Sequence, residues 1–254
     1  MGTQLLRLVE SWDQHIVLLL NQFAARSAVF DSIVYDLADS SILQGGLFMA
    51  YFWWAWLRTD GPVARRRCEV IISIGGGIAA STISRIMQVT LPFHTRPLHT
   101  ESLHFVVPLG VNPETLNTWS SMPSDHAAMY FAFATAIWYQ SRPLGYAAMV
   151  WTLVFGLIPR IYLGYHYPSD IVAGIVCGVI IMVLTWNLVP RSRAIGRLLV
   201  WEKSHRALFY PAAFLLTYEV AILFFDVRHL ARDAYDLVKL ALHVQPVMQA
   251  GLGQ

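Results

Sequence analysis

The sequence predicts an all-α, polytopic membrane protein with about six transmembrane helices. Its 254 residues are 56% hydrophobic and only 13% charged, and the mean hydropathy is +0.49. A soluble domain carries about 25% charged residues, so this composition argues against a soluble protein. The formal net charge is only +2 and no long basic stretch is present, which argues against a nucleic-acid-binding protein.

Six apolar segments approach the length of about 20 residues that a spanning helix needs. Turn residues and charges separate them, as at Asp60-Gly61-Pro62. We predict spans at residues 41–57, 69–93, 124–140, 144–165, 168–189 and 207–225. An additional span within residues 11–38 is an alternative.

Two segments that flank these spans mix apolar and charged residues. Residues 4–24 and 229–243 therefore favour amphipathic helices that lie on the membrane surface. We expect the whole chain to form a single membrane-embedded domain. The predicted parts are a domain over residues 1–254, a core at about residues 30–190, and peripheral helices at residues 1–40 and 226–254.

Basic residues are distributed unequally between the two sets of loops. One set contains Arg58, Arg65, Arg66, Arg67, Arg142, Arg191, Arg193, Arg197, Lys203 and Arg206. The opposite set contains Arg96 and, near a helix end, Arg160. The positive-inside rule therefore places the first set in the cytoplasm. The loop of residues 94–122 then lies on the outer, periplasmic side of the inner (plasma) membrane.

Unusual polar residues collect in three groups on that outer side. The first is the stretch Phe93–Pro97, where the second span ends, and the second is Pro123–His126, where the third span begins. The third runs from Arg160 to Asp170, across the turn between the fourth and fifth spans. The predicted topology brings all three groups to the same face.

The types of residue in these groups suit phosphate. Pro123 predicts a helix start, because proline is favoured in the first helical turn, and the free N–H groups near Ser124 then form an anion site. Arg96 and Arg160 each offer a planar fork of donors that matches phosphate oxygens. Each group alone is typical of an ordinary helix end. Their joint occurrence in the outer loops favours a site, because charges at membrane depth are costly.

The histidines suggest a two-step displacement. Asp170 follows His166 by four residues, so its carboxylate can hold one ring nitrogen and leave the other free to attack phosphorus. His126, in the anion-binding turn, is placed to protonate the leaving oxygen. This chemistry passes through a phosphohistidine and requires no metal and no cofactor. His99, Glu101 and His104 in the outer loop lack a metal-binding spacing.

Together these motifs resemble the type 2 phosphatidic acid phosphatase superfamily of membrane lipid phosphatases. The signature of that family reads K-x6-RP, then PSGH, then SR-x5-H-x3-D, and the resemblance covers about residues 30–190. It implies that His166 is the nucleophile, His126 the general acid and Asp170 the orienting residue. It also implies a phosphate cradle formed by Arg96, Ser124 and Arg160.

The sequence departs from the signature in three places. Val89 stands where the lysine is expected, Pro159 replaces the serine, and Asp125 replaces the glycine. Arg85 lies one helical turn deeper than Val89 on the same face, and we predict that it contributes to phosphate binding; a polar role in helix packing is the alternative. Asp125 resembles the form found in family members that hydrolyse polyprenyl diphosphates. Its alternative role is to supply negative charge at a helix start.

The predicted activity is removal of a terminal phosphate from a lipid (di)phosphate at the outer face, with undecaprenyl or another polyprenyl diphosphate as the first candidate. Phosphatidic acid, phosphatidylglycerol phosphate and lipid A phosphate are alternatives. The signature also resembles the vanadate site of haloperoxidases, but those are soluble. A non-catalytic lipid-binding or carrier protein is the remaining alternative. The expected partners are the lipid substrate and the bilayer, and the oligomeric state stays open.

Two further patterns concern packing. Gly174 and Gly178 form a G-x3-G pair, which is typical of closely packed membrane helices. The run Gly75–Gly77 predicts close packing or a flexible point. Trp53, Trp54 and Trp56, near the cytoplasmic end of the first span, indicate an interfacial aromatic belt.

Overall fold

The structure is a computed structural model that describes residues 2–189 and 193–250, and the part described is all-helical, as predicted. Arg191, one of the predicted cytoplasmic arginines, lies outside the described residues. The α-helices are α1 (Gly2–Asn21), α2 (Ala28–Asp39), α3 (Leu47–Leu57), α4 (Val63–Thr90), α5 (Asp125–Gln140), α6 (Arg142–Trp151), α7 (Ile158–Tyr162), α8 (Pro168–Leu188), α9 (Arg193–Ser204), α10 (Arg206–Ala221) and α11 (Phe225–Ala250). Four shorter helical segments complete the described structure. The π-helices are η1 (Ile42–Gly46) and η4 (Thr152–Leu157), and the 3-10 helices are η2 (Pro97–His99) and η3 (Glu101–Leu103).

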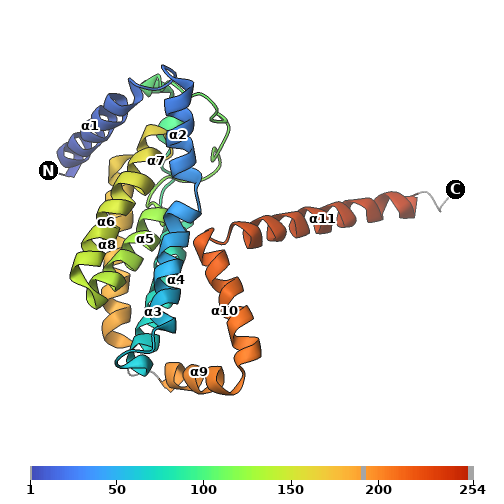
Figure 1. Cartoon of the computed structure of the whole chain (residues 1–254). Helices are drawn as coiled ribbons and strands as arrows, with labels where there is room; N and C mark the ends of the chain where they lie inside the picture. The colour runs from blue at the N-terminus through green and yellow to red at the C-terminus, as the bar shows by residue number, and fades with distance from the viewer. Residues whose placement is uncertain (1, 190–192, 251–254) are drawn as a thin grey trace.

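The bundle is organised around α5, which packs against α4, α6 and α8. Small side chains on α5 make this central position feasible, since Ala127, Ala128 and Ala132 are fully buried and let neighbouring backbones approach. The helices α4, α6 and α8 run side by side along the long axis of the molecule, with α9 across one end and α1 at the other (Figure 1).

Three helices in the described residues are long and apolar enough to cross a membrane: α4, the continuous helix Arg142–Tyr162, and α8. The pair α10 and α11, bent by 87°, adds a fourth if it counts as one span. α3 has 11 residues and α5 has 16, fewer than the about 20 that span a bilayer. The chain is therefore a multi-pass membrane protein, and the count of six spans remains a prediction.

The helix Arg142–Tyr162 contains a π-helical stretch, η4, immediately before α7. Pro159 lies in the first turn of α7 and has no backbone N–H to donate. Just before it, the N–H of Ile158 bonds the carbonyl of Leu153, one residue further back than in an α-helix. This local change precedes Arg160, in line with the frequent occurrence of π-bulges beside functional residues.

The predicted close packing at the G-x3-G pair is present, and it lies within the chain between α8 and α5. A Cβ atom on Gly174 would lie 2.4 Å from Ser124 O, and one on Gly178 would lie 2.1 Å from Ala128 O. Only glycine permits this approach. The pair thus holds the start of α8 against the start of α5, where two of the three polar groups lie.

Polar side chains fasten the N-terminal helix α1 to the end of the bundle where α8 begins. Asp13 of α1 accepts a hydrogen bond from the N–H of Ser169 at 2.9 Å, at the first turn of α8. Asn21 exchanges two hydrogen bonds with Val106 of the loop between α4 and α5, at 2.7 and 2.9 Å. Residues 11–38 do not form one helix, because residues 22–27 separate α1 from α2.

Candidate active site

Three hydrogen bonds draw the three polar groups together at one end of the bundle. Arg96 Nη1 donates to the carbonyl of Tyr165, which connects the first group to the third. The N–H of Ser124 donates to Asp170 O at 3.0 Å, which connects the second group to the third. The N–H of Ser121, just before the second group, donates to His94 O at 2.9 Å. Segments about 70 residues apart in sequence therefore share one site.

The ring of His166 is buried, and Nδ1 lies 2.9 Å from the carbonyl oxygen of Ser121. A carbonyl oxygen only accepts hydrogen bonds, so Nδ1 carries the proton and Nε2 holds a free lone pair. Burial lowers the pKa of His166 below its ordinary value, which keeps the imidazole neutral. The ring is thus held in the form that a nucleophilic histidine needs.

Asp170 occupies a different place from the one we expected. Its Oδ2 accepts the N–H of Tyr167 at 2.7 Å and lies 3.8 Å from His166 Nδ1, which is beyond hydrogen-bonding distance. Its Oδ1 lies 3.2 Å from His94 Nδ1. The orienting hydrogen bond to His166 therefore comes from Ser121, while Asp170 caps α8 and places a buried negative charge beside both rings.

Asp125 connects His126 to Arg85. Its Oδ1 lies 2.9 Å from His126 Nδ1 and 3.0 Å from the N–H of His126, and its Oδ2 accepts a hydrogen bond from Arg85 Nη2. Because a carboxylate accepts, His126 Nδ1 is a donor and Nε2 faces away from Asp125. Asp125 is only 4% exposed, so this departure from the signature is neutralised by Arg85 and does not stand as an unpaired charge.

Arg85 is also held by two further contacts at the rim of the site. Nη1 donates to Gln88 Oε1 at 3.0 Å, and the guanidinium lies 4.9 Å from the centre of the Trp119 ring. Val89, at the position of the signature lysine, is 69% exposed and lines the same cavity as Arg85. The structure therefore provides a cation near the place that the lysine would occupy.

Arg96 is buried among backbone carbonyls. Nε donates to Trp119 O at 3.1 Å, Nη2 donates to Ser120 O at 3.1 Å, and Nη1 donates to Tyr165 O. These contacts use three of the five guanidinium N–H groups. Burial lowers the pKa of Arg96 to about 10, which leaves the group charged at neutral pH.

The guanidinium of Arg160 has a donor that no group in the described part of the chain accepts. Nη2 donates to Ala38 O at 2.8 Å, which ties α7 to the end of α2. Nε is buried and has no hydrogen-bond partner within the described part of the chain. An unpaired buried donor on a cation is costly, and such a group is commonly reserved for a ligand.

The turn that carries Ser124 is supported from α4. Gln88 Nε2 donates to Pro123 O at 2.6 Å and Ser84 Oγ donates to the same oxygen at 3.2 Å. Ser124 is the N-cap of α5, and its Oγ accepts the N–H of Ala127 at 3.4 Å. In this arrangement the Ser124 hydroxyl caps the helix.

Several residues of this site were not predicted from the sequence. Gln88 had a usable signal, since an amide in an apolar span three residues from Arg85 marks a polar face. Ser121 had none, because it acts through its backbone carbonyl. His94 belongs to the first group, but its contact with Asp170 depends on how the loop folds.

Comparison with known proteins places the chain in a family. The sequence profile of the PAP2 superfamily matches residues 68–194, half of the chain. The chain belongs to the PAP2 superfamily. The resemblance drawn from the three motifs is thereby confirmed, and the matched region contains Arg85, Arg96 and the segments from Ser124 to Asp170.

Several relatives and solved structures are similar to this chain. Undecaprenyl-diphosphatase BcrC of Bacillus subtilis is 26% identical over 155 residues, which cover 61% of this chain and 72% of the relative. Lipid A 1-diphosphate synthase of Escherichia coli is 30% identical over 151 residues, which cover 58% of this chain and 61% of the relative. The crystal structure of Aquifex aeolicus LpxE is 21% identical with a TM-score of 0.47, and the match covers 68% of this chain and 93% of that one.

Proposed function

We propose that this PAP2-superfamily enzyme hydrolyses the terminal phosphate of a lipid diphosphate, with undecaprenyl or another polyprenyl diphosphate as its substrate. The chain is a hydrolase, a lipid phosphatase, by family membership. The observation that carries the detailed proposal is the pair of histidines with fixed Nδ1 atoms, His166 buried and His126 partly buried, each of which leaves Nε2 free of those contacts. The name of the BcrC relative supports the polyprenyl substrate, and lipid A phosphate is the second candidate because of the E. coli relative.

In the first step, His166 Nε2 attacks the terminal phosphorus, and the bond from phosphorus to the bridging oxygen breaks. His126 enters this step as the imidazolium, with its Nδ1–H held by Asp125. It gives its Nε2 proton to that oxygen and becomes neutral, and the lipid monophosphate leaves. In the second step, a water molecule attacks the phosphohistidine while His126 takes a proton from it. Inorganic phosphate departs and both histidines return to their starting forms.

Charge stabilisation in this scheme comes from arginines. Arg160 supplies its unpaired buried Nε–H, and Arg96 supplies the two N–H groups that do not bond carbonyls. Arg85 approaches from the rim, and the N–H groups at the start of α5 next to Ser124 add a helix-end contribution. Phosphoryl transfer depends mainly on such positioning and charge stabilisation.

We further propose that the site faces the periplasm in the inner or plasma membrane. Arg193, Arg197, Lys203 and Arg206 belong to α9 or directly follow it. α9 lies at the end of the bundle opposite to α1, whose Asp13 contacts the start of α8 beside the site (Figure 1). The positive-inside rule then assigns the α9 end to the cytoplasm.

The proposal is tested by phosphate release from detergent-solubilised protein, with and without EDTA. The substrate panel contains undecaprenyl diphosphate, phosphatidic acid, phosphatidylglycerol phosphate and lipid A diphosphate. We expect the highest kcat/KM for undecaprenyl diphosphate, no effect of EDTA, and loss of release in His166→Ala. A folded wild-type protein that releases no phosphate from any of these lipids would indicate a non-catalytic lipid-binding protein.

The role of Arg85 has a test of its own. Arg85→Ala should lower kcat/KM by about 10²-fold, because one charge-assisted contact to the transferring phosphate is lost. Arg85→Lys should recover part of that loss, since an ammonium supplies the charge without the planar fork. Arg142→Ala, at the opposite end of the bundle, is the matched control. Near-normal turnover of Arg85→Ala would leave Arg85 with a packing role.

A further inference from the structure

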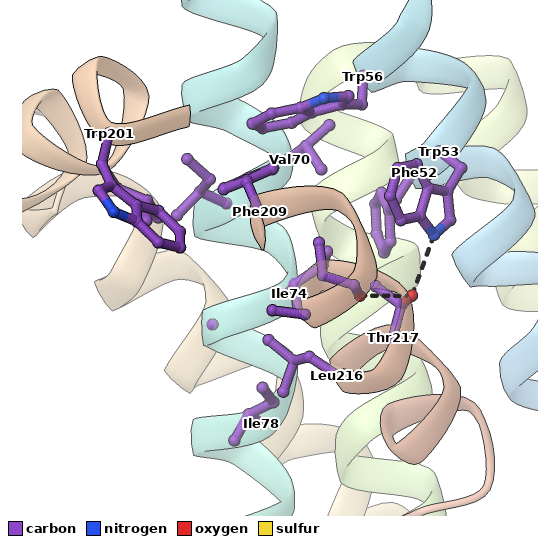
Figure 2. Close-up of a pocket in the computed structure, with 15 residues that line it drawn as sticks. Phe52, Trp53, Trp56, Val70, Ile74, Ile78, Trp201, Phe209, Leu216 and Thr217 are labelled. Carbon is purple, nitrogen blue, oxygen red and sulfur yellow. Dashed lines mark hydrogen bonds between the residues drawn. The ribbon is translucent and has the colours of Figure 1, made fainter. Parts of the chain in front are cut away.

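An apolar cavity of about 340 Å³ lies between α4 and α10 in the half of the bundle away from the catalytic residues. Figure 2 shows Val70, Ile74 and Ile78 of α4 on one wall, opposite Leu216 and Thr217 of α10. Trp201 of α9 lies at one end of the cavity. Its lining offers a ligand almost only apolar atoms, since the Thr217 hydroxyl is already engaged by Trp53 Nε1 at 3.0 Å.

A second cavity, of about 260 Å³, is lined by residues farther along the same face of α4, at the end that carries Arg85. Ile71, Ile74 and Ile78 line the first cavity, and Thr82, Arg85 and Val89 line the second. Spacings of three and four residues place these side chains on one stripe of the helix. The interval from Val70 to Val89 is about 28 Å at 1.5 Å per residue, nearly the thickness of the hydrocarbon core.

The two cavities together are called the groove. Its other wall, formed mainly by α10, is fixed to the bundle at a distance from α4. α10 packs on α3 and η1, and a Cβ on Gly45 would lie 2.2 Å from Ala221 O. The stacked rings of Trp56 and Phe209, 5.4 Å apart, hold the far end of α10. Trp53 and Trp56, which we predicted for an aromatic belt, therefore contact α10. These contacts with α3 and η1 hold α10 in its position in front of α4.

The groove changes character at its catalytic end. Arg85 and Asp125 line the second cavity from α4 and α5, and Arg228 lines it from α11. Below this polar end, Gly75 faces open space, with no atom within 4 Å of where its Cβ would be. A long apolar track with cations at one end matches an amphiphile with an anionic head and a hydrocarbon tail.

We propose that the groove between α4 and α10 binds the hydrocarbon tail of the lipid phosphate substrate while its head group occupies the catalytic site. This inference rests on the proposed function and deepens it. α9, α10 and α11 lie almost entirely beyond the family-matched residues 68–194, so this chain supplies the tail site from its own C-terminal helices. The length of the groove selects long tails, because a short tail ends before it reaches Gly75, about 15 Å below Arg85.

The test fills the groove and compares two substrates that share a head group. In mixed micelles of fixed composition, we expect Gly75→Leu to lower kcat/KM for undecaprenyl diphosphate by about tenfold, as expected when a tail loses a well-packed pocket. Geranyl diphosphate, whose tail is too short to reach Gly75, should be hydrolysed as by the wild type. Gly196→Leu on α9 is the matched control, because Gly196 also faces open space but lines neither cavity.

A second variant keeps the test decisive if Gly75→Leu does not fold. Ala212→Leu narrows the groove from the α10 side and should give the same selective loss, with Ala207→Leu of α10 as its control. Equal losses with both substrates, or no loss with either, would overturn the tail site and favour a groove filled only by bilayer lipid. A wild-type protein that hydrolyses neither substrate would overturn the proposed function and the tail site with it.

Discussion

His166 Nδ1 lies 2.9 Å from the carbonyl oxygen of Ser121, in the loop between α4 and α5, just before the start of α5. The carbonyl fixes the proton on Nδ1 and leaves a lone pair on Nε2, the proposed nucleophile. Ser121 is itself held through its N–H and Oγ by the carbonyl of His94, at 2.9 and 3.1 Å. The loop between α4 and α5 thus sets the orientation of the proposed nucleophile, in place of the carboxylate four residues later in sequence.

The first prediction follows from this contact. Rapid quenching of the enzyme with labelled lipid diphosphate should trap phosphate on His166 Nε2, because Nδ1 is engaged with Ser121. Phosphorus NMR of the quenched and digested protein distinguishes the two phosphohistidine isomers. His205→Ala, on an exposed histidine at the other end of the bundle, should label as the wild type does. Phosphate found on Nδ1, or on no histidine, would contradict the assignment.

The second prediction concerns Asp125 as a positioning residue for His126. Asp125→Asn keeps the shape but weakens the hold on His126 Nδ1, 2.9 Å away, so protonation of the leaving oxygen becomes less efficient. We expect kcat for the lipid substrate to fall by about 10²-fold, within the range of general-acid contributions. The comparison is made with an aryl phosphate whose leaving group needs no proton.

For that activated substrate, the initial burst of aryl alcohol release by Asp125→Asn should slow by less than about tenfold, because this first step needs no protonation of the leaving oxygen. Asp60→Asn in the loop between α3 and α4 serves as the control for a lost carboxylate. Equal losses with both substrates would show that Asp125 supports the fold or Arg85, and not proton transfer by His126.

The residues that define the site were visible in the sequence because each is unusual where it stands. Arg160 and His126 are ionisable groups in otherwise apolar helices, and such groups are rarely placed there without a function. The G-x3-G pair of Gly174 and Gly178 was readable for a similar reason, since it predicts close backbone approach and the structure places both against α5. Composition, together with apolar segments close to the length of a spanning helix, was enough to predict an all-helical membrane protein.

Other features could not be read from the sequence because they depend on backbone placement. The partner of His166 is a carbonyl, which every residue possesses. The His94 contact with Asp170 and the Asp13 contact with Ser169 join residues 76 and 156 positions apart, and no local pattern encodes such pairs. The number of spans also stays open, because α3 and α5 are buried helices of marginal length whose apolar sequences resemble spans.

The third prediction concerns pH and His94. His94 Nδ1 lies 3.2 Å from Asp170 Oδ1, and this contact raises the pKa of His94 above its ordinary value of 6.5. Protonation therefore stabilises the folded state. The stabilisation is complete below about pH 6.5 and is lost as the pH rises through the raised pKa. It amounts to about 1 kcal/mol at most, because 42% of the His94 side chain is exposed and solvent screens the pair.

The measurement compares thermal midpoints of the wild type and His94→Gln in detergent between pH 5.5 and 8.5, a range of roughly the span over which histidines titrate. The wild-type advantage should be about 2–4 °C at the acidic end and should vanish at the alkaline end. The charges of Asp13 and Glu10 also raise the pKa of His94, and both residues are present in the wild type and in His94→Gln. Burial lowers the pKa of His166, an opposite contribution that cancels in the difference. A constant gap across the range would contradict a titrating His94–Asp170 pair.

The fourth prediction joins packing to catalysis through Gly178. A side chain at this position would meet Ala128 O of α5 at 2.1 Å from its Cβ, so Gly178→Leu must push α8 away from α5. Overpacking of this kind costs about 1–3 kcal/mol, which should lower the thermal midpoint by several degrees. The same displacement stretches the 3.0 Å bond from the N–H of Ser124 to Asp170 O, so kcat should fall as well. Val176→Leu, on the half-exposed face of the same helix, should change neither quantity. A stable and fully active Gly178→Leu would show that the α5–α8 contact does not hold the site together.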